Sequence, residues 1–223
     1  MKNFSNRYIF LFSAAMVLFV SAGLAVASLV LAPYQQRNIQ IESYRNILTS
    51  LGVESTPSTA ETLFGQYIKE ELVVLEGSVV EGKRAAEASG SEQVLYLAQK
   101  EDKTYYIVPL HGKGLWGKLW GYVALESDRN TVSGVVFAHS SETPGLGAEI
   151  STAEFQSQFV GKKFVDPSKG FVSISLLKKG SYTPGDFAVD AISGGTLTSN
   201  GVQAMLSDCL SAYQSYFSNL KSE

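Results

Sequence analysis

The strongest helical pattern in the chain follows immediately after Asp190-Ala191-Ile192-Ser193-Gly194-Gly195-Thr196-Leu197-Thr198-Ser199-Asn200-Gly201. Adjacent glycines let a backbone come close to a ligand, and hydroxyl side chains at a helix start cap the helix or hold phosphate. Ser199 or Asn200 is expected to be the cap. A polar loop that only starts a helix is the simpler interpretation, and it stays open at this point.

The pattern after this stretch predicts a long amphipathic helix. Its apolar residues recur three and four positions apart and form one stripe, which consists of Val202, Met205, Leu206, Cys209, Tyr213, Tyr216, Phe217 and Leu220. A helix of this kind packs on a sheet or on a partner. Because Cys209 lies on the stripe, we interpret it as a small buried apolar residue and not as a redox group.

The middle of the chain has the pattern of a β-sheet. Short runs rich in β-branched and aromatic residues, divided by polar turns, predict strands at 72–75, 94–98, 104–108, 119–125, 132–137 and 171–177, with a hairpin turn at 126–130. Ser58-Thr59-Ala60-Glu61 and Ser151-Thr152-Ala153-Glu154 fit capping boxes that start short helices. Because these elements do not alternate as β-α-β units, residues 58–223 are expected to form an α+β domain with an antiparallel sheet and flanking helices.

The N-terminal part predicts a membrane anchor. Residues 9–32 carry no charge and exceed the roughly 20 helical residues that cross a bilayer. Since Lys2 and Arg7 precede the span, residues 1–8 are placed in the cytoplasm and the domain outside it. Residues 33–57 are expected to form a linker whose helix ends at Gly52. A cleaved signal peptide is the open alternative, because residues 25–28 are small as at a cleavage site.

Composition narrows the classes of function. The net charge of −3 and the lack of a basic cluster in the sequence argue against nucleic-acid binding. The single cysteine excludes an intrachain disulfide. His111 and His139 have no cysteine partners, so no metal site is predicted. Gly112-x-Gly114-x-x-Gly117 has the spacing of a dinucleotide fingerprint, but the next predicted element, at 119–125, is a strand and not the required helix. The chain is therefore not expected to bind NADH itself.

Two more glycine-marked segments point to a flat ligand. In the first, residues 111–121, glycines alternate with Trp116 and Trp120 and leave room for a ring against an indole face. The second is Glu142-Thr143-Pro144-Gly145-Leu146-Gly147, where Pro144-Gly145 suits a type II turn that projects Leu146. Taken alone, each segment is also compatible with core packing or a bare turn.

Together with these segments, Asp190-x-x-Ser193-Gly194-Gly195-Thr196 resembles the flavinylation signature Asp-x-x-(Ser/Thr)-Gly-Ala-(Ser/Thr). In proteins with that signature, a Mg-dependent flavin transferase joins FMN, taken from FAD, to the final hydroxyl through a phosphoester bond. Over nearly the whole chain the sequence resembles the C subunit of the sodium-translocating NADH:quinone reductase. The related G subunit of the Rnf complex shares the anchor and the last two motifs, whereas Gly114-Leu115-Trp116 favours the C subunit of the reductase.

The resemblance implies that FMN is attached covalently to Thr196 and that the transferase recognises Asp190. The cofactor-binding residues it implies are Trp116 and Leu146 beside the ring, Glu142, Thr143, Gly145 and Gly147 at its polar edge, Ser193, Gly194, Gly195, Leu197 and Thr198 around the phosphate and ribityl chain, and Lys179 against the phosphate charge. No catalytic residue and no metal ligand are implied. Gly195 departs from the usual alanine, and an extra residue between His139 and Glu142 leaves His139 without an implied role.

The function implied by the resemblance is electron relay. The chain would be one subunit of a translocase in the bacterial inner membrane, with its domain in the periplasm and no independent substrate turnover. Electrons from NADH, oxidised at another subunit, would pass through FMN toward quinone, coupled to export of Na⁺. The expected partners are the other subunits, the flavin transferase and the membrane. The alternatives are the ferredoxin-linked Rnf subunit with the same covalent flavin, and a non-redox membrane-anchored binding or assembly module.

Overall fold

The computed structural model describes residues 5–220, and the chain divides into two units at residues 43 and 44. Residues 1–4 and 221–223, and with them Lys2 and the outer ends of the predicted segments 1–8 and 58–223, lie outside the described residues. The first unit is helical and belongs to α1 (Asn6–Ser50), which has Pro33 in its interior. By length and composition α1 could cross a membrane. The predicted anchor and the helix after it are therefore one continuous element.

The C-terminal end of α1 agrees with the prediction. Gly52 has a φ of 67°, the left-handed conformation that commonly follows a helix. The N–H of Val53 donates to the carbonyl of Leu48 at 2.9 Å, which closes the helix end in the manner of a Schellman motif.

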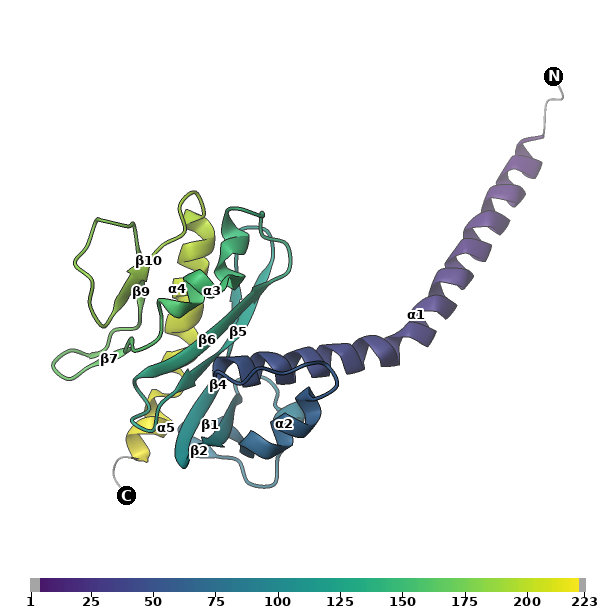
Figure 1. Cartoon of the computed structure of the whole chain (residues 1–223). Coiled ribbons are helices and arrows are strands. Elements are labelled where there is room, and N and C mark those ends of the chain that lie inside the picture. The colour runs from purple at the N-terminus through teal and green to yellow at the C-terminus, as the bar shows by residue number, and fades with distance from the viewer. Residues whose placement is uncertain (1–4, 221–223) are drawn as a thin grey trace. The chain divides into compact units, whose positions relative to one another are not determined.

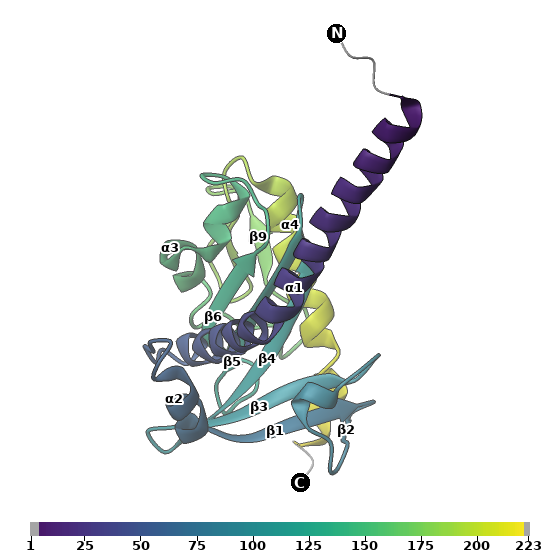
Figure 2. The same ribbon diagram turned by 90° about the vertical axis from the view of Figure 1, so that its right-hand side faces the viewer.

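The second unit is built on a six-stranded antiparallel sheet with the strand order β2-β1-β3-β4-β5-β6 (Figures 1 and 2). The strands are β1 (Ile68–Leu75), β2 (Ser78–Val79), β3 (Gln93–Lys100), β4 (Lys103–Lys113), β5 (Lys118–Leu125) and β6 (Val132–His139). The first five predicted strands are confirmed, as is the α+β class. The predicted turn between β5 and β6 is also confirmed, because Asp128 accepts hydrogen bonds from the N–H groups of Asn130 and Thr131.

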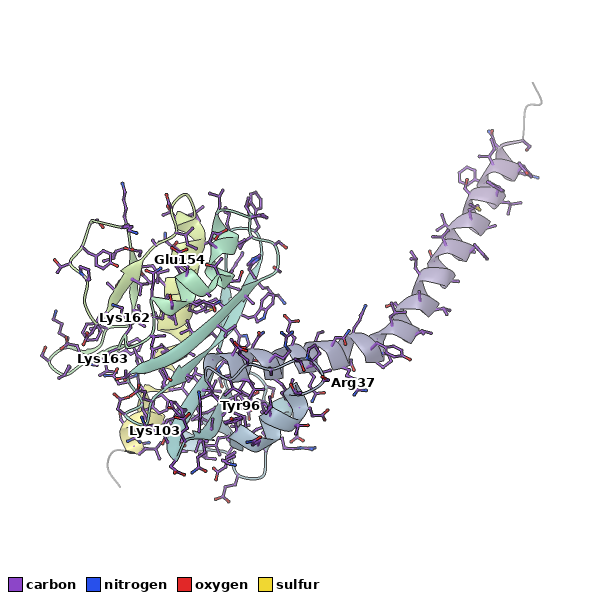
Figure 3. All side chains as sticks on the ribbon, in the orientation of Figure 1. Arg37, Tyr96, Lys103, Glu154, Lys162 and Lys163 are labelled. Carbon is purple, nitrogen blue, oxygen red and sulfur yellow. The ribbon has the colours of Figure 1, made fainter. Side chains whose placement is uncertain are left out.

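Helices cover both faces of the sheet. One face packs against α3 (Ala153–Ser157), α4 (Thr196–Ser211) and α5 (Gln214–Asn219) in the larger apolar core. The other face packs against the last turns of α1 and against α2 (Ala60–Tyr67). There Phe64 stacks on Tyr44 and meets Tyr96, labelled in Figure 3, edge to face.

The predicted C-terminal helix is wrong as a single helix. It is two helices, α4 and α5, separated at residues 212–213, although Val202 and Phe217 at either end of the stripe are both buried. The expected cap at Ser199 or Asn200 is also wrong, because α4 starts at Thr196 with Gly195 as its N-cap. The buried Ser199 hydroxyl accepts the N–H of Ile192 at 3.0 Å instead, so it serves the loop before the helix.

The strand predicted at 171–177 is wrong as one strand. Its start forms β8 (Gly170–Phe171), which pairs with β7 (Val165–Asp166), and its end forms β9 (Ser175–Leu177), which pairs in parallel with β10 (Ala188–Asp190). The break has a physical cause: Ser173 has a φ of 58°, and the N–H groups of Val172 and Ser173 both donate to the carbonyl of Phe164.

Both predicted capping boxes are misplaced by one residue. The N-caps are Thr59 for α2 and Thr152 for α3. Only Thr152 caps through its side chain, which accepts the N–H of Phe155 at 3.3 Å. The Thr59 hydroxyl instead accepts the N–H of Thr56, so it closes the turn that precedes the helix.

Candidate functional site

Thr196 lies at the exposed first position of α4, directly after a tight turn. Gly194 forms the turn with a φ of 73°, and the N–H of Gly195 donates to the carbonyl of Ile192 at 3.1 Å. The first helical bond runs from the N–H of Ser199 to the carbonyl of Gly195. The N–H groups that precede it have no partner within the helix, and the positive end of the helix dipole lies there. This helix end therefore favours an anion beside the Thr196 hydroxyl.

A pocket with a volume of about 140 Å³ opens at this end of α4. It is formed by the β4–β5 connection, the segment after β6 and the turn before α4. The predicted site residues that line it are Glu142, Thr143, Leu146, Gly147, Gly194, Gly195, Thr196, Leu197 and Thr198. The structure thus brings together most of the predicted site from segments far apart in the sequence. Leu115 also lines the pocket and was not predicted, although its place in Gly114-Leu115-Trp116 was a signal for it.

Glu142 is the buried centre of this site, with only 5% of its surface exposed. Its Oε1 accepts a hydrogen bond from the backbone N–H of Trp116 at 2.9 Å, and its Oε2 accepts one from the hydroxyl of Thr198 at 2.5 Å. Its own N–H donates to Nδ1 of His139 at 3.2 Å, so His139 is a local hydrogen-bond acceptor. One carboxylate therefore joins the β4–β5 connection to the first turn of α4.

Glu142 is also stabilised in its ionised form. Burial raises the pKa of a carboxyl group, but the hydrogen bonds from Thr198 and from the N–H groups of Trp116 and Gly117 outweigh burial here. The pKa of Glu142 therefore lies below its ordinary value. Glu142 is therefore negatively charged at neutral pH.

Two motif glycines leave room for this carboxylate. A Cβ at Gly147 would lie 2.6 Å from Glu142 Oε2 and closer still to Thr198 Oγ1, and a Cβ at Gly114 would lie 2.9 Å from Glu142 Cδ. A third glycine is needed at the turn, because Gly194 has a left-handed φ and a Cβ there would lie 2.7 Å from Leu146 Cδ2. A larger residue is therefore disfavoured at Gly114 and Gly147 by packing and at Gly194 by its backbone conformation.

Exposed apolar side chains accompany the pocket. Leu115, Leu146 and Leu197, which line it, are 48%, 41% and 59% exposed, and Trp116 is 66% exposed beside Leu115 in the chain. The backbone N–H of Trp116 is held by Glu142, while the indole ring of Trp116 does not line the pocket. Apolar side chains that remain exposed beside a polar pocket are typical of a surface that binds a ligand or a partner.

The predicted type II turn is present beside the pocket. The N–H of Leu146 donates to the carbonyl of Thr143 at 3.1 Å, and Gly145 has a φ of 73° at the third position of the turn. Gly145 does not itself line the pocket. Its N–H donates to Oε1 of Glu149 at 3.1 Å, so its observed role is to shape the loop.

Three predicted site residues lie in a different place. Asp190, Ser193 and Lys179 line a neighbouring hollow of about 590 Å³. Lys179 Nζ lies 3.9 Å from Asp190 Oδ2, and the hydroxyl of Tyr182 donates to Asp190 Oδ1 at 3.2 Å. Lys179 thus faces an aspartate and does not line the Thr196 pocket.

Comparison with known proteins points in one direction. A family model described as FMN-binding domain matches residues 114–211. The C subunit of the Na(+)-translocating NADH-quinone reductase of Vibrio vulnificus is 32% identical over 206 residues, 80% of each chain. The same subunit of Vibrio anguillarum is 34% identical over 216 residues, 85% of this chain and 84% of the relative.

Solved structures agree with the sequence relatives. In the crystal structure from Parabacteroides distasonis, the C subunit of Na(+)-translocating NADH-quinone reductase is 40% identical with a TM-score of 0.77, and the match covers 84% of this chain and 96% of that one. Shewanella oneidensis NqrC is 25% identical with a TM-score of 0.71, and the match covers 85% of this chain and all of that one. The similarity therefore extends well beyond the residues that line the pocket.

Proposed function

Because this chain belongs to the family of C subunits of the Na(+)-translocating NADH-quinone reductase, we propose that it is an FMN-carrying electron-relay subunit of that complex. One observation carries the proposal: three separate glycine-marked segments meet in a single pocket beside the Thr196 hydroxyl at the start of α4. FMN has an anionic phosphate and a flat apolar ring. The N-terminus of α4 suits the phosphate, and the exposed apolar side chains beside it suit the ring.

The residues of the site fit FMN. The phosphate would bind at the N-terminus of α4, because helix N-termini are preferred sites for phosphate groups. The pocket of about 140 Å³ is below the roughly 300 Å³ at which pockets for whole ligands begin. The exposed side chains of Trp116, Leu146 and Leu197 would therefore hold the ring outside it. When bound, FMN supplies reversible electron transfer, while the protein binds and orients it.

We infer that the attachment is covalent and that Thr196 is the acceptor. Thr196 Oγ1 would lose its proton and form the ester bond to the FMN phosphorus of FAD, while the phosphoanhydride bond of FAD breaks and AMP leaves. A flavin transferase would bind the FAD and catalyse the transfer. Support comes from the exposed position of Thr196 and from the turn at Gly194 that presents it. By contrast, Thr198 is 2% exposed and its hydroxyl is engaged by Glu142. Of these two hydroxyls, only that of Thr196 is open to another protein.

The wider role follows from the family. We propose that α1 anchors the chain in the bacterial inner membrane, with the domain on the outer face as the charges before the span favour. Electrons from NADH would pass through this protein toward quinone, coupled to export of Na⁺. The partners would be the other subunits of the complex and, during maturation, the transferase, which we expect to recognise Asp190.

Intact-mass measurement tests the assignment of Thr196. The full chain, co-expressed with a flavin transferase, should gain the mass of one FMN less one water, and Thr196→Ala should gain nothing. Thr104→Ala is the control, because it removes an exposed threonine hydroxyl of β4 outside the pocket and should leave the added mass unchanged. A wild-type chain that stays unmodified under these conditions would refute the proposal.

A further inference from the structure

The carboxylate of Glu142 is turned toward the protein. Its two oxygens accept hydrogen bonds from Trp116 and Thr198, on two different segments, and 5% of the residue remains exposed. A side chain that recognised a ligand directly would direct a polar atom into the open part of the pocket. The room for this carboxylate is provided by Gly114 and Gly147, whose missing Cβ atoms would otherwise collide with it.

We propose that Glu142 is a positioning residue, an ionised clamp that sets the distance between the Trp116 loop and the first turn of α4. The clamp reaches α4 through Thr198, two residues after the proposed acceptor Thr196. It would hold the apolar residues of the Trp116 loop at a fixed position relative to the start of α4 before any ligand binds. The inference rests on the proposed function for the identity of that ligand, FMN.

The strength of the clamp follows from its chemistry. Hydrogen bonds to a charged group contribute more than neutral ones, about 1.5–3 kcal/mol each. Removing the Thr198 hydroxyl would also leave one oxygen of a buried carboxylate without this donor. At about 1.4 kcal/mol per factor of ten, losing this bond changes the population of the clamped arrangement by about 10- to 100-fold.

The test compares Thr198→Val with Thr198→Ser in the full chain. Valine keeps nearly the same shape without the hydroxyl, whereas serine keeps the hydroxyl and loses the methyl group. A role in packing alone predicts that Thr198→Ser, which loses a buried methyl group, is affected at least as much as Thr198→Val, which keeps the shape. A positioning role predicts that serine preserves the clamp and that valine breaks it.

Trp116 reports on the clamp directly. In a Trp120→Phe background it is the only tryptophan, so its fluorescence anisotropy in the unmodified chain measures the mobility of the loop. Anisotropy should fall in Thr198→Val and in Glu142→Gln and stay at the wild-type value in Thr198→Ser. The initial rate of FMN transfer to Thr196 should fall about tenfold or more in Thr198→Val and less than about threefold in Thr198→Ser.

Equal anisotropies in Thr198→Val and Thr198→Ser would overturn the proposal, as would equal transfer rates. If Thr198→Val does not fold, Glu142→Gln against Thr198→Ser decides the question by the same two readouts. If the wild-type chain is not modified by the transferase, the proposed function fails, while the anisotropy of the unmodified chain still decides whether Glu142 is a clamp.

Discussion

Gly147→Ala should destabilise the site, because Gly147 is buried against the Glu142 carboxylate and the Thr198 hydroxyl. A Cβ at Gly147 would lie 2.6 Å from Glu142 Oε2 and 3.1 Å from Thr198 Cβ, and both neighbours are at least nine-tenths buried. The methyl group must therefore force the carboxylate and the hydroxyl apart. Overpacking costs about 1–3 kcal/mol and the charged hydrogen bond contributes about 1.5–3 kcal/mol, so the free energy of unfolding should fall by about 3–5 kcal/mol.

The assay is thermal and urea unfolding of the full chain in detergent micelles. For a domain of this size each kcal/mol corresponds to about 2–4 °C, so the Tm of Gly147→Ala should fall by about 10 °C. Gly185→Ala is the control, because Gly185 has no atom within 4 Å of its missing Cβ and no left-handed φ; it should change stability by less than about 0.5 kcal/mol. A Gly147→Ala chain within about 1 kcal/mol of wild type would show that the carboxylate and hydroxyl yield easily and would refute the reasoning.

Two further predictions concern the same site. Gly195→Ala, which introduces the alanine typical of the signature, should lower stability by about 1–3 kcal/mol, because a Cβ there would lie 2.9 Å from Cγ2 and 3.2 Å from Cβ of Ile192. Gly194→Ala should cost about 1–2 kcal/mol in the same urea titration, because its φ of 73° is left-handed. Since the pKa of Glu142 is lower in the folded chain, its stabilisation is complete above the pKa of the unfolded chain and is lost as the pH falls through the folded pKa. The difference in unfolding free energy between wild type and Glu142→Gln should therefore shrink from about pH 6 to about pH 3, and parallel pH curves would contradict this.

The sheet could be predicted from the sequence because its strands combine β-branched residues with clear turn signals. The strand predicted at 171–177 failed, since nothing in the residue pattern shows that Ser173 takes a left-handed φ to let two N–H groups share one carbonyl. The start of α4 was misplaced for a related reason. Ser199 has the side chain of a cap, but its hydroxyl is already used by Ile192, and the cap is a glycine that offers no side chain.

The membership of the pocket could be predicted better than the contacts within it. Motif glycines and their neighbours named most of the lining residues. The resemblance implied that Lys179 lies against the phosphate charge, whereas its Nζ lies 3.9 Å from Asp190 Oδ2 in the tertiary structure. The position of Glu142 was predicted as well, but the sequence cannot reveal which way a carboxylate points when its donors, Trp116 and Thr198, lie far away along the chain.

Glycines in the three segments are required by packing within the chain, independently of any ligand. Gly114 and Gly147 make room for the buried Glu142, and a Cβ at Gly201 would lie 2.5 Å from the carbonyl oxygen of Lys113, so α4 can approach the β4–β5 connection only with glycine there. These contacts exist within the chain itself. Glycines from all three segments are therefore also packing residues, because Gly114, Gly147 and Gly201 allow the close contacts that hold α4 against Glu142 and the end of β4.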